Sequence, residues 1–531
     1  MKKNIFIKTT SLILALVTLL GLCACGGKDS KTKKVSAKRS TEPVTITYYY
    51  CSGPGVQQYT QKVQDKLNEI LANIEGYENI TIELHPYGSS YLRDLTLAQA
   101  TGVQIDLVNV YGLNRSSTIK NGDLMELDDL MNEFPDMVES LPDWVMNYGK
   151  LFGHQYYIPS YQQAANLTYI VTPTEYLNMY LELTGKSRKD VSKLITTSDV
   201  EGKLDFLEDL CNAVRAGTGL DTKWINTGEF WASNLLSNVF YNQEYIGTQF
   251  SPWIFKEGAD APEYFGYTED YKTIMERFAG WYKDGLLHPE VTTVNYHKFI
   301  EENFLENESY VCQFVTDTCS EEYLEKYMKK QYGIDVTALR VTDHAYIPSE
   351  WEAGGQAVYT DCEHPYEAMM IIDLLRTEKG KEFYNTLVYG LEGVQWKWED
   401  KDKDRIVTLE YNTQQGGSDT SYAAYKWNNG NVLYAYKNQA VLDGFYEYIE
   451  NEVNNGSTSV KSPAMGITWD LSNVSTEISQ CQVVESEYVN TIYISKDWEK
   501  RYNDYIKKLE AAGVQTVLDE MAKQFKEFKK K

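Results

Sequence analysis

Strands and helices alternate at the start of the folded part of this chain, and this alternation limits its fold more than any other feature. Residues Val44 to Tyr50 (VTITYYY) are β-branched or aromatic, as strand residues often are, and Val63, Leu67 and Ile74 then recur at helical spacing. Strand, helix and strand patterns follow at Ile80 to Leu84, Tyr91 to Ala100 and Ile105 to Val110. Right-handed crossovers make such a βαβαβ unit a parallel sheet. The sequence therefore predicts an α/β fold.

The same pattern indicates where a ligand would bind. Ligands of open α/β sheets lie outside the carboxyl ends of the strands. Cys51 to Gly55 follow the first predicted strand, and Asn109 to Leu113 follow the third. These two segments are the first candidates for a binding site.

Periodic patterns predict further elements along the chain. Apolar residues at helical spacing, separated by Gly and Pro, favour helices at Thr174 to Leu183, Lys203 to Arg215, Tyr271 to Lys283 and Pro365 to Leu375. A strand is expected at Tyr310 to Val315, and a hairpin from Val394 to Trp398 and Arg405 to Tyr411. Two final helices are expected at Trp498 to Ala512 and Val514 to Phe528.

The first residues have the layout of a secretory signal peptide. Three lysines precede a run from Leu12 to Leu22 that only Thr18 and Gly21 interrupt, and eleven residues are too few to span a bilayer. Ala24-Cys25 then resembles a bacterial lipobox, in which a small residue precedes the cysteine that receives a diacylglyceryl group. Cys25 is therefore the expected lipid site, and Cys23, which follows the large Leu22, is the weaker alternative.

A flexible tether is expected after the lipid site. Residues 26–41 contain six basic residues, one acid and no aromatic side chain. Such a segment cannot bury enough apolar area to fold. Its positive charge would hold it near anionic headgroups.

The net charge argues against nucleic acid as a partner. The chain carries −25, and residues 1–24 hold three lysines and no acids, so the chain without them carries −28 and the body beyond the basic tether about −33. Phosphate backbones would repel so acidic a body. The sign also argues against highly anionic ligands. The 42 Tyr and 11 Trp, against 17 Phe, would suit an amphipathic ligand such as a sugar, although most of them are expected in the core and on the surface.

Motifs of catalysis and metal binding are missing from the sequence. It contains no HExxH, GxSxG or GxGxxG, and its cysteines have no CxxC spacing. Asp400, Asp402 and Asp404 have the spacing of a calcium loop, but Arg405 stands where glycine is needed. No metal, no cofactor and no catalytic residue are predicted. A pair of carboxylates for glycoside hydrolysis remains an alternative because its spacing is spatial.

Several segments together resemble a known family. They are Leu97 to Asn109 (LAQATGVQIDLVN), Asn121 to Leu130 (NGDLMELDDL), Gly153 to Pro159 (GHQYYIP), Tyr389 to Gly393 (YGLEG) and Met465 to Asp470 (MGITWD). Their order resembles that of the family 1-like extracellular solute-binding lipoproteins of carbohydrate-type bacterial ABC importers. The last segment and the final helices resemble a C-terminal domain of unknown function that a subgroup carries.

The resemblance implies a two-lobed, type II periplasmic-binding-protein-like clamp whose lobes are joined by crossing hinge strands. The expected parts are a signal peptide (1–24), a lipidated tether (25–42), an N-terminal lobe (43–155 plus about 336–378), a C-terminal lobe (about 156–335 plus 379–497) and a C-terminal helical pair (498–531). Hinge closure around a solute is a known motion of such proteins.

The implied function is capture of a solute outside the cell and its delivery to ABC permease subunits. The solute is expected to be a saccharide or oligosaccharide, the protein a lipid-anchored monomer on the extracytoplasmic face of the membrane, and not an enzyme. A secreted carbohydrate-active enzyme and a peptide-binding or sensory protein remain alternatives.

Aromatic side chains are the leading candidates for ligand contact. Tyr111 follows the third strand, Trp231 and Trp351 lie in segments whose family counterparts often face the cleft, and Trp396 follows the turn at residues 390–393. Further candidates are Tyr50 and Tyr161 and, as polar partners for hydroxyl groups, Asn109, Glu352 and Glu392.

Overall fold

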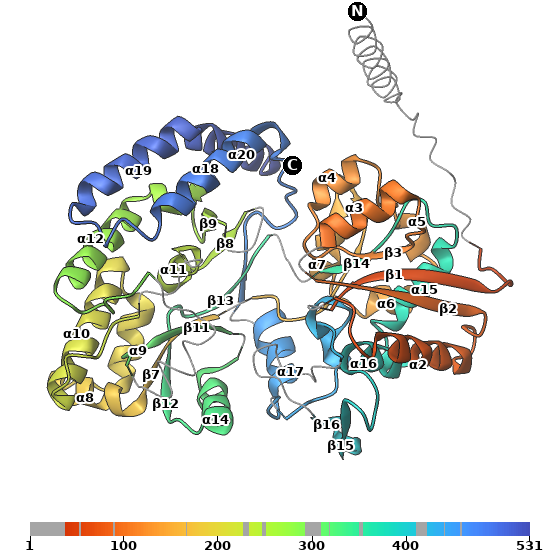
Figure 1. The fold of residues 1–531 in the computed structure, drawn as a ribbon, viewed down its shortest axis with the longest axis horizontal. Helices are drawn as coiled ribbons and strands as arrows, with labels where there is room; N and C mark the ends of the chain where they lie inside the picture. The colour runs from red at the N-terminus through yellow and green to blue at the C-terminus, as the bar shows by residue number, and fades with distance from the viewer. Residues whose placement is uncertain are drawn as a thin grey trace, which may run out of the picture. The chain divides into compact units, whose positions relative to one another are not determined.

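The first sheet contains the predicted parallel strands. In the computed structural model, β1 (Val44–Cys51) lies between β2 (Ile80–Tyr87) and β3 (Leu107–Asn109) and runs parallel to both. The strand order is β2-β1-β3-β14-β6, in which β14 (Gly355–Val358) and β6 (Ile158–Pro159) extend the sheet with antiparallel pairs. The βαβαβ prediction is confirmed (Figure 1).

Most of the chain beyond the predicted tether is described by the structure. The described residues are 38–52, 55–88, 91–165, 167–226, 233–246, 251–292, 309–317, 319–349, 354–409, 422–439, 441–456 and 459–530. Residues 39–531 form one unit of the structure. The predicted signal peptide and Cys25 lie outside the described residues.

We call the part of the structure built on the first sheet the first lobe, and two further sheets belong to the second lobe. The first has the order β11-β7-β12, and the second has the order β10-β9-β8; all of their pairs are antiparallel. Their strands are β7 (Leu167–Pro173), β11 (Gln313–Asp317), β12 (Val336–Arg340), β8 (Gln243–Tyr245), β9 (Trp253–Lys256) and β10 (Glu263–Tyr264). The strand predicted near residues 310–315 is β11.

Short two-stranded sheets complete the described β-structure. The predicted hairpin is confirmed as β15 (Trp396–Asp400) paired with β16 (Arg405–Thr408). In its turn the Lys403 ammonium lies 3.0 Å from the Asp400 carboxylate. Asp400 is the first of the three acids with calcium-loop spacing, and here it forms an ion pair with a lysine. The others pair β4 (Lys150–Leu151) with β5 (His154–Gln155) and β13 (Ala345–Ile347) with β17 (Ser459–Lys461).

The predicted helices are present, and apart from α10, which is three residues longer at each end, their ends lie within two residues of those expected. They are α2 (Thr60–Asn73), α3 (Tyr91–Thr101), α8 (Thr174–Thr184), α10 (Val200–Thr218), α12 (Glu269–Lys283), α15 (Pro365–Leu374), α19 (Trp498–Ala512) and α20 (Val514–Phe528). Further helices are α4 (Arg115–Lys120), α5 (Asp128–Met131), α6 (Pro135–Glu139), α7 (Asp143–Met146), α9 (Arg188–Thr197), α11 (Ser233–Phe240), α14 (Glu321–Tyr332), α16 (Lys381–Tyr389), α17 (Phe445–Tyr448) and α18 (Ser475–Tyr488).

Pairing and packing correct the expected lobe limits at three segments. β12, which we expected in the N-terminal lobe, pairs with β7 of the second lobe. β6, which we expected in the C-terminal lobe, is the edge strand of the first sheet, and α16 contacts α2 of the first lobe. A local sequence pattern predicts a strand or helix but not the element that it packs against, so the lobe to which these three segments belong could not be predicted from the sequence. The remaining limits stay predictions.

The C-terminal helices are an integral part of the second lobe. We expected a pair, but α18 packs on both α19 and α20, so three helices form this part. Cys481 of α18, Leu509 of α19 and Met521 of α20 are fully buried in the same apolar cluster as Leu210 of α10. Figure 1 shows the three helices, in blue, beside α12 and β9.

A buried arginine fixes the strand at which the chain leaves the first sheet. The Arg376 guanidinium is fully buried and donates to the carbonyls of Ile158 at 2.6 Å, Pro159 at 3.0 Å and Ile372 at 3.2 Å. Burial lowers the pKa of this guanidinium to about 9. Because Ile158 and Pro159 form β6, these bonds hold the start of the crossing segment in place.

Candidate functional site

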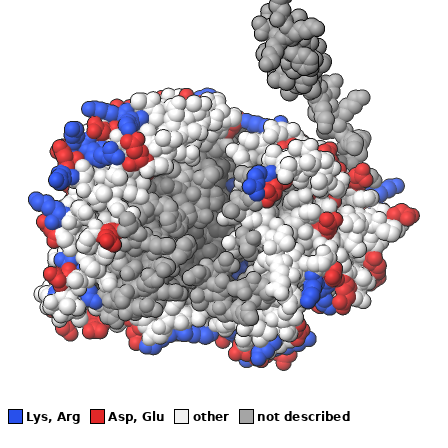
Figure 2. All heavy atoms as spheres, in the orientation of Figure 1, with Lys and Arg blue, Asp and Glu red and all other residues white. Residues whose placement is uncertain are grey.

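A cavity lies where the carboxyl end of β3 meets the second lobe. Its volume is about 630 Å³, within the range of ligand sites. On the visible face, Lys, Arg, Asp and Glu side chains of the described residues gather at the outer edges of both lobes (Figure 2). The lining comes from residues 110–117 and Lys120; Asn147, Tyr148, Lys150, Leu151 and Tyr157; Ile246, Ser251 and Trp253; Ser349 and Gly354; and residues 465–472 with Ser475, Ile478, Ser479 and Gln482.

The first wall begins at the switch point of the parallel sheet. After β1 the chain forms β2 on one side and β3 on the other, and the segment after β3 lines the cavity. The buried Asn109 at the end of β3 accepts a hydrogen bond from the backbone N–H of Tyr111 at 2.9 Å. Gly112 then has a φ of 78°, a conformation that favours glycine, and turns the chain into α4. This turn places Tyr111 at the cavity.

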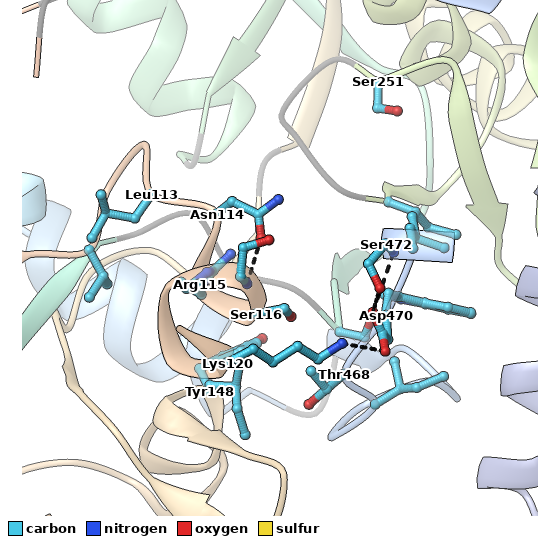
Figure 3. A pocket seen from close by; sticks show the side chains of 18 of the residues that line it. Leu113, Asn114, Arg115, Ser116, Lys120, Tyr148, Ser251, Thr468, Asp470 and Ser472 are labelled. Carbon is cyan, nitrogen blue, oxygen red and sulfur yellow. Dashed lines mark hydrogen bonds and ion pairs between the residues drawn. The ribbon is translucent and has the colours of Figure 1, made fainter. Parts of the chain in front are cut away.

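Polar side chains of α4 and of the neighbouring loops line the same wall. Asn114 caps α4 by accepting from the N–H of Ser117 at 3.0 Å. Arg115 donates to the Tyr157 hydroxyl at 2.9 Å and stacks on its ring, with 5.8 Å to the centroid. Tyr148 donates to a backbone carbonyl at 2.7 Å. Figure 3 shows Asn114, Arg115 and Tyr148 around the cavity.

The second wall is formed by the segment before α18 and by α18 itself. The Lys120 ammonium lies 2.5 Å from the Asp470 carboxylate, so this ion pair joins α4 of the first wall to the second wall (Figure 3). Ser472 donates to the other carboxylate oxygen at 2.7 Å. The bonds from Lys120 and Ser472 hold the pKa of Asp470 below its usual range. Asp470 is therefore a carboxylate at neutral pH.

One face of α18 turns toward the cavity. Ser475, Ile478, Ser479 and Gln482 line it at spacings of three, four and seven residues, which place them on one side of a helix. Hydroxyl and amide groups thus dominate this face.

Three buried polar groups at the cavity have no hydrogen-bond partner among the described residues. They are the indole N–H groups of Trp253 and Trp469 and the hydroxyl of Ser349. Trp253 is 2% exposed and Trp469 is 4% exposed. Buried polar groups are nearly always hydrogen-bonded. The three residues line the cavity, but the three polar atoms are covered by neighbouring atoms, so a ligand or water would reach them only if the wall opens locally.

The structure places the predicted contact residues in different surroundings. Tyr111 lines the cavity, and Asn109 lies behind it, fully buried. Tyr50 is also buried, with its hydroxyl 3.2 Å from that of Tyr422, and Tyr161 is 3% exposed. Trp231, Trp351 and Glu352 lie outside the described residues.

Trp396 and Glu392 lie at the β15–β16 hairpin, and neither lines the cavity. The Trp396 indole is 5% exposed, donates to the carbonyl of Gly390 at 3.1 Å and packs edge-on against Trp398. Glu392 is exposed. The turn before Trp396 therefore directs its ring into an aromatic cluster.

Sequence reasoning missed most of the second wall. Residues 465–470 were recognised only as a family signature, and α18 was not predicted. The apolar stripe of α18 is short, with Cys481, Val484 and Tyr488 as its buried residues, while the cavity face is polar. A helix whose second face lines a polar cavity shows little contrast between its two sides, which is why its periodicity was weak.

Neither a metal cluster nor a membrane-spanning helix is found in the described part of the chain. No group of three or more His, Cys, Asp or Glu side chains there could hold a metal ion. No helix among the described residues is both long and apolar enough for a membrane crossing. The six cysteines of the described ranges are all buried, and Cys312 is a free thiol.

Comparisons with known proteins agree with this architecture. The chain is 22% identical over 549 residues to a carbohydrate ABC transporter substrate-binding protein of Streptococcus pneumoniae, covering 100% of this chain and 99% of that protein. The crystal structure of the N-glycan transport solute binding protein of S. pneumoniae matches with a TM-score of 0.68 and 19% identity, covering 92% of this chain and 99% of the other.

Sugar complexes of such proteins match as well. The same N-glycan transport protein matches with TM-scores of 0.61 in complex with Man1GlcNAc and 0.58 in complex with Man5GlcNAc. FusA, an S. pneumoniae ABC-transporter substrate binding protein in complex with kestose, matches with a TM-score of 0.56 and 13% identity over 92% of this chain and 99% of the other.

A family model also matches the end of the chain. Residues 463–530 match the domain of unknown function DUF3502. This range begins with the cavity-lining segment and contains α18, α19 and α20. The expected resemblance to carbohydrate-type solute-binding proteins, with a C-terminal domain of unknown function, is confirmed. The chain has the two-lobed α/β fold of solute-binding proteins of ABC transporters and ends in the DUF3502 domain.

Proposed function

We propose that this protein is the extracytoplasmic, lipid-anchored solute receptor of an ABC importer and that its solute is an oligosaccharide. The cavity between the end of β3 and α18 would hold the sugar, and the permease subunits would receive it. Cys25 would carry the lipid that keeps the protein at the membrane surface.

The unpartnered donors in the cavity wall carry this proposal. A sugar ring has apolar C–H faces and many hydroxyl groups, so it needs both aromatic surface and hydrogen-bonding groups. The indoles of Trp253 and Trp469 combine an apolar ring with an N–H that has no partner among the described residues, and the Ser349 hydroxyl is a third such group in the wall. Pockets that combine an apolar wall with a few placed polar groups are typical of small-molecule sites.

The relatives narrow the class of solute. The similar proteins with bound sugar hold Man1GlcNAc, Man5GlcNAc or kestose. A cavity of about 630 Å³ has room for more than one sugar ring. We therefore expect an oligosaccharide of a few residues, bound without chemical change.

Binding can be tested with Man1GlcNAc, Man5GlcNAc and kestose, and with a peptide mixture as a comparison. A ligand at one hundred times its Kd stabilises the folded state by about 2.7 kcal/mol, which a thermal-shift assay detects, and calorimetry then gives the Kd. Products would be analysed after long incubation. Stabilisation by peptides alone would refute the sugar assignment, and release of shorter sugars would refute the assignment as a receptor without activity.

A further inference from the structure

We infer that the DUF3502 domain is a sugar-binding element: its segment 465–472 forms the second wall of the cavity, Asp470 bonds to the sugar, and Gln524 is the residue that positions Asp470. The inference rests on the proposed function, and it gives the domain a role in recognition at the same cavity. The wall is fixed to the second lobe, Asp470 is held in place within it, and its carboxylate faces a cation of the first lobe.

The domain is fixed to the second lobe by buried contacts. The Glu485 carboxylate of α18 accepts hydrogen bonds from Tyr264 of β10 at 2.8 Å and from Tyr505 of α19 at 2.5 Å. Phe525 of α20 packs edge-on against Phe255 of β9, with 4.7 Å between ring centroids. These contacts tie all three helices to the lobe, so the wall they carry moves with it.

Gln524 holds the backbone of Asp470 at both of its polar groups. Its side-chain oxygen accepts from the Asp470 N–H at 2.9 Å, and its side-chain nitrogen donates to the Asp470 carbonyl at 2.6 Å. The same residue also donates to Glu520 one turn earlier at 2.8 Å, which fixes its amide orientation. A loop residue is thus anchored to the last helix although 54 positions separate them.

The Asp470 carboxylate faces the first lobe. It pairs with Lys120 of α4, and the two side chains are 42% and 41% exposed, so both retain surface that a ligand can reach. A carboxylate accepts several hydrogen bonds, and an ammonium donates three. Together they can bind neighbouring hydroxyl groups of one sugar ring, and the adjacent Trp469 lines the same wall with an N–H that has no partner among the described residues. The DUF3502 domain therefore supplies both a polar and an aromatic contact.

The inference is tested with Asp470→Asn and Gln524→Ala in the full protein. The probe is whichever of Man1GlcNAc, Man5GlcNAc and kestose binds the wild type most tightly. We expect Asp470→Asn to weaken binding about tenfold, as loss of a charge-assisted hydrogen bond does, and Gln524→Ala to weaken it about threefold. Because Gln524 acts through Asp470, the double variant should lose little more than Asp470→Asn alone.

Matched controls come from the same helix. Gln515 donates to Asp519 at 2.8 Å on the exposed side of α20, and neither residue lines the cavity. Gln515→Ala and Asp519→Asn should leave the Kd unchanged. Hydrogen exchange gives an independent readout, since the amides of residues 465–482 should become protected when the sugar binds.

The possible outcomes are distinct. If the wild type binds none of the three sugars, the proposed function fails and this inference fails with it. If the wild type binds a sugar but Asp470→Asn and Gln524→Ala bind it as tightly as the wild type does, the inference alone is wrong. It is also wrong if the losses of binding free energy in the two single variants add up in the double variant, because Gln524 would then act independently of Asp470. A fall in melting temperature with an unchanged Kd would assign Gln524 a purely structural role and would also overturn it.

Discussion

Replacing Trp469 by Phe should leave the empty protein as stable or more stable while weakening sugar binding. The Trp469 indole N–H is buried at the cavity without a partner among the described residues. An unsatisfied buried donor costs roughly 1 to 3 kcal/mol. The smaller ring leaves a void, and about 40 Å³ of void costs roughly 1 kcal/mol at about 24 cal/mol per Å³. The two effects give a net change in the free energy of unfolding between about zero and 2 kcal/mol in favour of the variant.

Binding should change in the opposite direction. If the N–H donates to a sugar hydroxyl, its removal costs about 1 kcal/mol of binding free energy, or roughly fivefold in Kd. Urea unfolding without ligand measures the first effect, and calorimetry with the tightest-binding sugar of the panel measures the second.

Trp281→Phe is the matched control. This indole is also buried, but its N–H donates to Glu208 at 2.7 Å and it does not line the cavity. Here the same substitution breaks a bond to a charged group, so stability should fall and the Kd should stay constant. An unchanged Kd in Trp469→Phe would refute the assignment of this N–H to the ligand.

Three other predictions concern the core, the buried charges and the anchor. Trp396→Ala should lower the free energy of unfolding by about 3 to 5 kcal/mol in urea without changing the Kd, since this ring is buried away from the cavity; weaker binding at unchanged stability would contradict this. Burial lowers the pKa of Lys203 to about 8. Between pH 8 and about pH 10.4 the unfolded chain still holds the proton that the folded chain has lost, so the free energy of unfolding should rise with pH by up to about 3 kcal/mol. Lys203→Met lacks this proton, and urea unfolding of both proteins at pH 7 and pH 10 would measure the difference. Parallel pH profiles of the two proteins would contradict the prediction. Cys25→Ser should abolish labelling by a radioactive fatty acid and Cys23→Ser should not; the reverse result would move the lipid site to Cys23.

Local patterns were sufficient for the elements of the first sheet but not for its complete membership. Residues 44–110 carry the βαβαβ signal within one continuous stretch, so the parallel sheet and the position of Tyr111 after its third strand could be predicted. β14 joins β3 across more than 240 positions, from a stretch of four residues, and no local periodicity indicates such a partner. Strand pairing over that distance is decided by the packing of the whole lobe.

The candidate site was only partly predictable for the same reason. Tyr111 could be named because a general rule places ligands at the carboxyl ends of parallel strands. Trp396 was named for its turn, but a turn does not determine whether the next ring faces solvent, ligand or core, and here an aromatic cluster receives it. Asp470 and Lys120 lie 350 positions apart, so only the folded chain brings them together.

Charge gives the clearest case in which composition and site differ. The chain carries −25, and this sign argues against an anionic solute. Among the described residues that line the cavity, however, the charged ones are Arg115, Lys120, Lys150 and Asp470, which sum to a positive charge. Interactions between charges decay over about 8 Å at physiological ionic strength, so a bound sugar responds to these side chains more than to the distant acidic surface. Net charge thus argues against long polyanions that contact the whole face, whereas the lining of the cavity decides between a neutral and an acidic oligosaccharide.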